Sequence, residues 1–131
     1  MNKKFSIYSS RMANDLFKIL EINLEETTEI ERQIISAFAF GMINAYAIEE
    51  KIEPPKIHGT MIAVLINEFK YSEKQASEFV QTLINSTNRE YHPTMYTIIH
   101  RGIQAYYDYK EGKEKEVYDN LTYIIDIIVN K

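Results

Sequence analysis

The sequence predicts an all-α fold, a single-domain bundle of about six helices over residues 1–131, and three observations lead to this prediction. The chain contains only four glycines and three prolines, too few for the many turns of a β fold. Apolar residues recur at helical spacing in six segments. Two of these segments begin with a capping box, in which a Ser or Thr and a Glu or Gln three residues later bond each other's backbone amides.

The first two helices are predicted over residues 9–22 and from Thr28 to the region before Pro54. The second begins with the capping box of Thr28 and Glu31. Because apolar residues cover most of its circumference, we expect it to be the central helix. Its buried side is predicted to carry Ile30, Ile34, Ile35, Phe38, Ala39, Met42, Ala45 and Ile48.

Prolines and capping residues place the next three helices. Pro54 and Pro55 suit the first turn of a helix that extends to about residue 69. Ser72 opens a second capping box and a helix that ends near residues 86–88. His92 is a candidate cap for a helix over residues 93–110, and Gly112 follows it as a stop signal.

The last predicted helix begins at about Lys113 and buries Val117, Leu121, Ile124, Ile125 and Ile128. The run of residues 123–129 is rich in β-branched side chains, so local propensity also allows a strand. We favour the helix, because its apolar residues keep helical spacing.

Charge is unevenly distributed along the chain. Residues 21–53 contain eight glutamates against Arg32 and Lys51, a net charge of −6 within a total of −4. Glu49, Glu50 and Glu53 close this segment. Two interpretations stay open: solvated helix faces, or a docking surface for a basic partner. No basic stripe for nucleic acid is present, because the lysines of residues 110–115 alternate with glutamates.

The motifs of common enzymes are missing. Without cysteine the chain has neither a thiolate metal site nor a disulfide, which fits a reducing cytoplasm. The sequence contains no phosphate-binding loop and no Gly-x-Ser-x-Gly elbow. No apolar run is long enough to cross a membrane. We therefore expect a cytoplasmic protein that is not an enzyme and needs no cofactor.

The densest polar cluster lies in residues 90–101. Glu90, His92 and His100 allow a metal-dependent enzyme as a minor alternative, although two histidines eight residues apart on a helix lie about 12 Å apart, too far for one ion. A structural role is the second interpretation, in which His92 caps a helix while His100 and Arg101 pair with carboxylates of a neighbour. The third interpretation is a partner-binding hot spot.

Ten tyrosines are an unusual number for this length. Tyr106, Tyr107 and Tyr109 cannot all face the core, since consecutive helical positions diverge by about 100°. At least one should be exposed. Exposed tyrosine is typical of binding hot spots, and tyrosines at the rim of the core are the alternative.

Several motifs resemble the bacterial immunity protein 48 family. They are Ser-Ala-Phe-Ala-Phe-Gly-Met at residues 36–42, Phe-Lys-Tyr-Ser at 69–72 with Gln75 and Ala76, and above all the block of residues 90–102. The resemblance covers about residues 30–120. It implies an all-α protein, encoded beside a polymorphic secreted toxin, that neutralises the toxin by binding its effector domain.

Two further expectations follow. The partner is a cognate toxin effector domain, and a homo-oligomeric adaptor that forms a homodimer is the main alternative. The candidate partner-binding residues are Glu49, Glu50, Glu53, Glu90, Tyr91, His92, His100, Arg101, Tyr107 and Tyr109.

Overall fold

The computed structural model describes residues 3–130 and is all-helical, with no strand in that part of the chain. Residues 1, 2 and 131, which the one-domain prediction included, lie outside the described part. The elements are α1 (Lys3–Leu20), η1 (Leu24–Glu26), α2 (Glu29–Glu49), α3 (Pro54–Asn67), α4 (Glu73–Asn85), α5 (Pro93–Lys110) and α6 (Glu114–Val129). The prediction of about six helices is confirmed.

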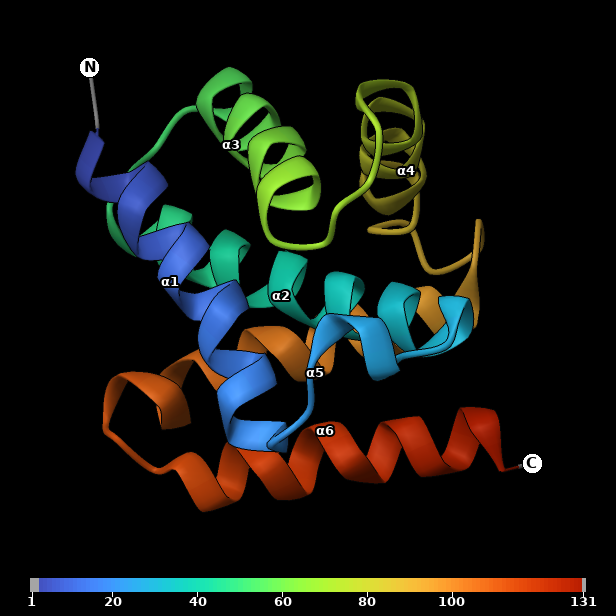
Figure 1. Cartoon of the computed structure of the whole chain (residues 1–131). Coiled ribbons are helices and arrows are strands. Elements are labelled where there is room, and N and C mark those ends of the chain that lie inside the picture. The colour runs from blue at the N-terminus through green and yellow to red at the C-terminus, as the bar shows by residue number, and fades with distance from the viewer. Residues whose placement is uncertain (1–2, 131) are drawn as a thin grey trace.

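Helix α2 is the centre of the molecule, as its sequence predicted. It contacts α1, α3, α5 and α6, and every residue from 34 to 47 except Asn44 is buried. In Figure 1 the helices α3 and α4 stand above α2, whereas α6 crosses below it. An apolar helix of this kind is stable only when neighbours cover most of its sides.

The most extensive helix contact joins α2 to α5, and two glycines make it close. A Cβ atom on Gly41 would lie 2.0 Å from the carbonyl oxygen of Ile99, and one on Gly102 would lie 2.1 Å from that of Phe38. Further along, Tyr46 packs on Tyr106. The contacts advance in the same direction along both helices, so α2 and α5 are parallel.

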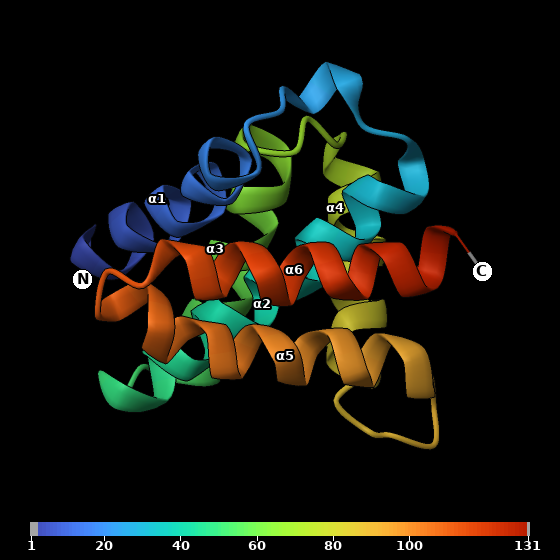
Figure 2. The ribbon, with the colours of Figure 1, turned by 90° about the horizontal axis from the view of Figure 1, so that it is seen from below.

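The remaining side of this pair is covered by α6 and α1. Figure 2 shows α6 beside α5, running in the opposite direction. Helix α1 contacts α2, α3 and α6, and the Tyr109 hydroxyl donates to Asp15 Oδ2 at 2.6 Å, which ties α5 to α1. The first and last helices of the chain are therefore neighbours.

Three of the predicted helix starts are confirmed in detail. Thr28 and Ser72 form capping boxes with Glu31 and Gln75. His92 caps α5, where its Nδ1 accepts from the Met95 amide at 3.1 Å. Such caps satisfy amides that have no partner within the helix.

Gly112 ends α5 as predicted, with a φ of +77° that glycine adopts without steric cost. The amide of Lys113 donates to the Asp108 carbonyl at 2.8 Å and that of Gly112 to Tyr109 at 3.0 Å, which completes a Schellman motif.

Four expectations are corrected. Helix α1 begins at Lys3 rather than near residue 9, because small hydroxyl side chains fit its packed face. Ser9 is buried, and Ser6 Oγ lies 3.5 Å from Thr60 Oγ1.

Ile30 and Ile48, which were expected on the buried side of α2, are 57% and 75% exposed, since they lie in the end turns of α2, outside the enclosed stretch. The strand alternative for residues 123–129 is wrong.

No helix in residues 3–130 is both long enough and apolar enough to cross a membrane.

Candidate functional site

At the common C-terminal end of α2 and α5, Glu49 is held by two side chains of α5. Its carboxylate accepts a hydrogen bond from the Tyr106 hydroxyl at 2.7 Å. It also forms an ion pair with Lys110, whose Nζ lies 2.6 Å from Glu49 Oε2. The Lys110 hydrogen bond is the main cause that lowers the pKa of Glu49. Both partners of Glu49 belong to the same chain, and the Glu49 side chain is only one-third exposed. We therefore assign Glu49 first to joining α2 and α5.

Beside Glu49 lies a tyrosine cluster, which we define as Tyr8, Tyr46, Tyr106 and Tyr109. The ring centroids of Tyr8 and Tyr46 are 4.6 Å apart, and those of Tyr46 and Tyr106 are 6.0 Å apart. Burial raises the pKa of all four hydroxyls. Tyr109, a candidate partner-binding residue, is thus half-buried in contacts between helices.

Tyr107 is the exposed tyrosine that helical geometry required. It is 49% exposed and its ring meets the edge of Tyr106 at 5.2 Å, whereas Tyr106 is only 1% exposed. The prediction that at least one of the three tyrosines faces solvent is confirmed. Together with exposed Glu50 and Glu53, Tyr107 offers contact area near this end of α2.

Glu90, Tyr91 and His92 lie at the opposite end of α5. Glu90 and Tyr91 are exposed in the loop before the helix, where the Glu90 amide donates to Asn88 Oδ1 at 2.9 Å. Tyr91 is 55% exposed, the most exposed of the tyrosines in residues 3–130. His92 is also exposed, but its Nδ1 is occupied by the cap.

His100 and Arg101 lie midway along α5. His100 packs against the ring of Tyr96 at 4.1 Å. Arg101 Nη1 donates to the Asn120 side chain at 2.7 Å, and its guanidinium lies 4.8 Å from the centre of the Tyr123 ring. The expected carboxylate partner of Arg101 is therefore wrong: the partner on α6 is an amide and an aromatic ring.

The ten candidate residues do not form one compact cluster. Eighteen residues of α5 span about 27 Å, so the groups at its two ends cannot contact the same small ligand. The acidic residues of segment 21–53 are likewise divided, since Glu29 and Glu31 open α2 while Glu49 and Glu50 close it. Nor do residues 3–130 contain three or more His, Asp or Glu side chains grouped to hold a metal ion.

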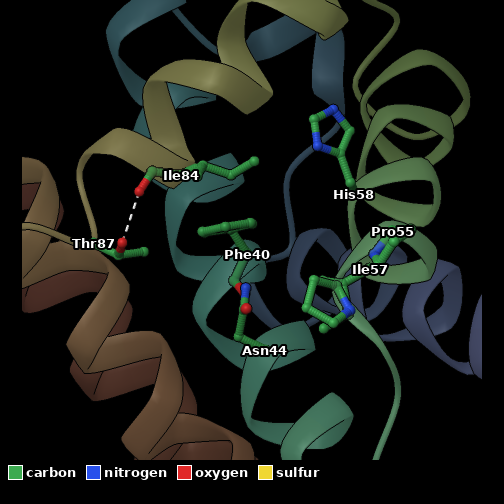
Figure 3. A pocket seen from close by; sticks show the side chains of 8 residues that line it. Phe40, Asn44, Pro55, Ile57, His58, Ile84 and Thr87 are labelled. Carbon is green, nitrogen blue, oxygen red and sulfur yellow. Dashed lines mark hydrogen bonds between the residues drawn. The ribbon is translucent and has the colours of Figure 1, made fainter.

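The structure also contains a groove that the sequence did not predict. We define the apolar groove as the space of about 650 Å³ that is lined by Phe40, Asn44, Pro54, Pro55, Ile57, His58, Ile84 and Thr87. Figure 3 shows Phe40 and Asn44 on α2 between His58 and Pro55 of α3 on one side and Ile84 and Thr87 on the other. A volume of this size lies within the range of about 300–1,000 Å³ that is usual for ligand pockets.

The groove exists because α3 and α4 form a hairpin that is open at one end. Its lining comes from the first turns of α3 and the last turn and end of α4, the two segments farthest from the loop that joins them. Tyr71, at that loop, is buried and packs on Phe79. Side chains fill the closed end of the hairpin and leave the other end unfilled above α2.

One family model matches the chain. It is described as Immunity protein 48 and matches residues 5–129, a longer stretch than the motifs recognised in the sequence. No curated protein and no solved structure matches the chain.

Proposed function

Because the chain belongs to the Immunity protein 48 family, we propose that it binds the effector domain of a cognate secreted toxin and neutralises it by direct contact. The match of the family model to residues 5–129 carries this proposal. The mechanism is occlusion: a folded partner that covers the toxin's active site, or a surface beside it, stops the toxin without any reaction of its own. We place this encounter in the cytoplasm and expect the chain to act without catalysis.

Exposed members of the candidate set support the proposal. Tyr91 and Tyr107 are about half exposed, and Glu50, Glu53, Glu90 and His100 are exposed. Tyrosine supplies large contact area at low entropic cost, and acidic side chains accelerate association with a basic partner. Glu49, His92, Arg101 and Tyr109 already bond within the fold, so we assign them mainly to holding the surface in shape.

Co-expression with the protein encoded by the neighbouring gene tests the function. We expect that protein to stop growth alone, and the chain to restore growth and to co-purify with it. Tyr107→Ala should weaken the complex by about 2 kcal/mol, or about 30-fold in Kd, if it is a hot spot. Tyr118→Ala is the matched control, since Tyr118 is 42% exposed on α6.

The outcomes separate the function from its surface. A neighbour that neither binds nor harms cells contradicts the immunity function. A complex that forms normally with Tyr107→Ala leaves the function intact and removes Tyr107 from the interface.

Self-association is the second candidate function, and one observation favours it. Exposed apolar side chains occur on several helices, among them Ile7, Ile48 and Ile127. A homodimer would bury some of them. Light scattering on the purified chain distinguishes a monomer, which the immunity function predicts before the toxin binds, from a stable dimer.

A further inference from the structure

Resting on the proposed function, we propose that the exposed side of α1 docks the toxin and that it fits an acidic surface of the effector domain with a hollow for one apolar side chain. We define the basic face as the six exposed residues of α1, which are Lys3, Lys4, Ile7, Arg11, Asn14 and Lys18. None of the ten residues selected from the sequence belongs to this face.

The charge of the basic face has a single sign. Four of its six residues are cations and none is an acid, although acids outnumber cations in the whole chain by 19 to 15. Helix α1 contains one acid, Asp15, and so carries +3, while the rest of the chain carries −7 within the total of −4. A basic face on an acidic molecule attracts the acidic side of a partner and orients it during the encounter.

Three of the cations form a row along α1. Lys4, Arg11 and Lys18 are seven residues apart, which places them on nearly the same side of the helix, about 10.5 Å from one to the next. Figure 2 shows α1 at the edge of the molecule. A single partner can therefore contact all three cations at once.

The first two cations of this row have no carboxylate partner in residues 3–130. No ion pair joins Lys4 or Arg11 to an acid of that part of the chain. Lys18 Nζ lies 3.9 Å from Asp15 Oδ1, and the same carboxylate also accepts the Tyr109 hydroxyl. Carboxylates of a partner can thus pair with Lys4 and Arg11 without breaking an ion pair of the fold.

Two hollows meet at Ile7. One, of about 420 Å³, is lined by Lys4, Ile7, Tyr8 and Arg11, and the other, of about 340 Å³, shares Ile7 and Arg11 with it. Ile7 is 61% exposed. The proposed contact combines one apolar anchor with cations on both sides of it along the helix, so the matching surface has carboxylates around a hollow for Ile7.

Acids border the basic face without lying on it, and they limit what can bind. Asp15 and Glu68 line the second hollow, and Glu21 follows the last turn of α1. At the first turn, burial and then the charge of Glu50 raise the pKa of Tyr46, which packs there. A phosphate backbone would extend from the cations across these acids, whereas the carboxylates of a folded protein can be confined to the cations. We therefore infer an acidic protein surface rather than a nucleic acid.

The packing of α1 also disfavours a membrane surface. A helix that lies in a membrane interface inserts its apolar side. The apolar side of α1 is enclosed by the fold, since Phe5, Met12 and Leu16 are fully buried, and Ile7 is the one apolar residue of the basic face. One isoleucine fills a hollow in a protein but is too little to anchor a helix in lipid.

The first test measures the affinity of the purified chain for the effector domain encoded beside its gene. Lys4→Glu should raise Kd at least about tenfold, and the loss should shrink as salt increases. Lys74→Glu is the matched control and should leave Kd unchanged. Each lysine is exposed and is the second residue of its helix, and α4 lies on the far side of α3 from α1 (Figure 1). An acid in the first turn suits the helix dipole at both positions, so the fold should survive.

The apolar anchor is tested separately. Ile7→Asn should raise Kd at least about tenfold, and this loss should not depend on salt, because the substitution changes no charge. Ile127→Asn, at an isoleucine that is 41% exposed in the last turn of α6, should leave Kd unchanged. The melting temperature of each variant checks that it folds.

A fluorescent label reports the contact directly, because the chain has no cysteine. Asn14→Cys places a single thiol on the basic face, and an environment-sensitive fluorophore attached there should change its emission when the effector domain binds. The same label at Ser77→Cys, which is exposed on α4, should not respond. An Asn14 label that stays silent while calorimetry records normal binding overturns the proposal and leaves the immunity function standing.

Three other results also overturn the proposal. Equal losses of affinity for Lys4→Glu and Lys74→Glu would mean that the toxin responds to the total charge of the chain. Binding of duplex DNA, or of phosphatidylglycerol vesicles, that Lys4→Glu abolishes would assign the basic face to a nucleic acid or to a membrane. If the unmodified chain does not bind the effector domain at all, the proposed function fails, and the proposal for α1 fails with it.

Discussion

The carboxylate of Glu49 illustrates how one surface residue joins two helices. It receives the Tyr106 hydroxyl and the Lys110 ammonium at the end of α5, while the Tyr106 ring is almost completely buried. A hydrogen bond to a charged acceptor contributes more than one between neutral groups. The ammonium of Lys110 also lies 6.0 Å from the centre of the Tyr106 ring. Removing one oxygen atom from this arrangement therefore has a measurable effect.

Tyr106→Phe should lower the free energy of unfolding by about 1–2 kcal/mol, because it deletes the hydroxyl that bonds Glu49 and keeps the buried ring. Urea denaturation followed by circular dichroism measures the change. Tyr107→Phe is the control, and it should alter stability by less than about 0.5 kcal/mol because that side chain is exposed. Equal effects at the two positions would show that the Glu49 bond adds nothing.

At the scale of the elements, the contact between α2 and α5 depends on two residues without side chains. Gly41 and Gly102 face each other, and the atoms that an added Cβ would meet belong to the backbone of the opposite helix. Backbone within a helix cannot rotate away as a flexible side chain can. The whole helices would have to separate, and with them the most extensive contact of the core.

Gly41→Ala should destabilise the protein by about 3 kcal/mol or more, since its Cβ would lie 2.0 Å from the Ile99 oxygen. Gly59→Ala is the same substitution in α3, where nothing lies within 4 Å of the added atom. It should stabilise the protein by about 0.5–1 kcal/mol, because alanine is the better helix former. Thermal and urea denaturation measure the stability of both variants. Similar losses of stability at the two positions would contradict the close approach of α2 and α5 at Gly41.

The helix starts that carry a side-chain cap were predicted most closely, for a physical reason. Thr28, Ser72 and His92 cap helices through their own side chains, so the signal is local in the sequence. Helices α1 and α2 instead end through Glu21 and Lys51, which adopt φ values of 57° and 56° without being glycine. Pro54 limited the length of α2, but no glycine marked the residue at which either helix ends.

At the scale of the whole molecule, burial of tyrosine makes stability depend on alkaline pH. Burial is the main cause that raises the pKa of Tyr8, Tyr46, Tyr71, Tyr106 and Tyr109 above the usual 10.0. Above about pH 10 the unfolded chain loses these protons while the folded chain retains them. The unfolded state then binds fewer protons, so the free energy of unfolding falls as pH rises.

We therefore expect full stability from this source below about pH 10 and a progressive loss above it. Urea denaturation at intervals from pH 8 to 11 measures the slope. Tyr71→Phe should make the slope shallower, since it removes a half-buried hydroxyl bonded to Glu29 Oε2 at 3.1 Å. A free energy of unfolding that is constant up to pH 11 would contradict the assignment of these pKa values.

The candidate site was predictable only where it depended on a single helix. That at least one of Tyr106, Tyr107 and Tyr109 is exposed followed from the angle between adjacent helical positions, before any neighbour was known, and the exposed residue is Tyr107. The apolar groove combines Phe40, Pro54, Ile57 and Ile84 from three helices. None of these residues marks a cavity within its own segment. Only the opening of the α3–α4 hairpin, a tertiary property, leaves them around an unfilled space.

The parallel pairing of α2 and α5 also affects when the protein becomes functional during its synthesis. Gly41 and Gly102 are 61 positions apart in the chain. At about 5–20 residues per second, α2 waits about 3–12 seconds on the ribosome before its partner is made. Throughout this interval an almost entirely apolar helix is without its principal neighbour, and closing so long a loop makes folding slower still. Under the proposed function, a cell that produces a toxin and this chain together needs a standing supply of the finished chain, because newly started copies would give no protection until the last helices have emerged.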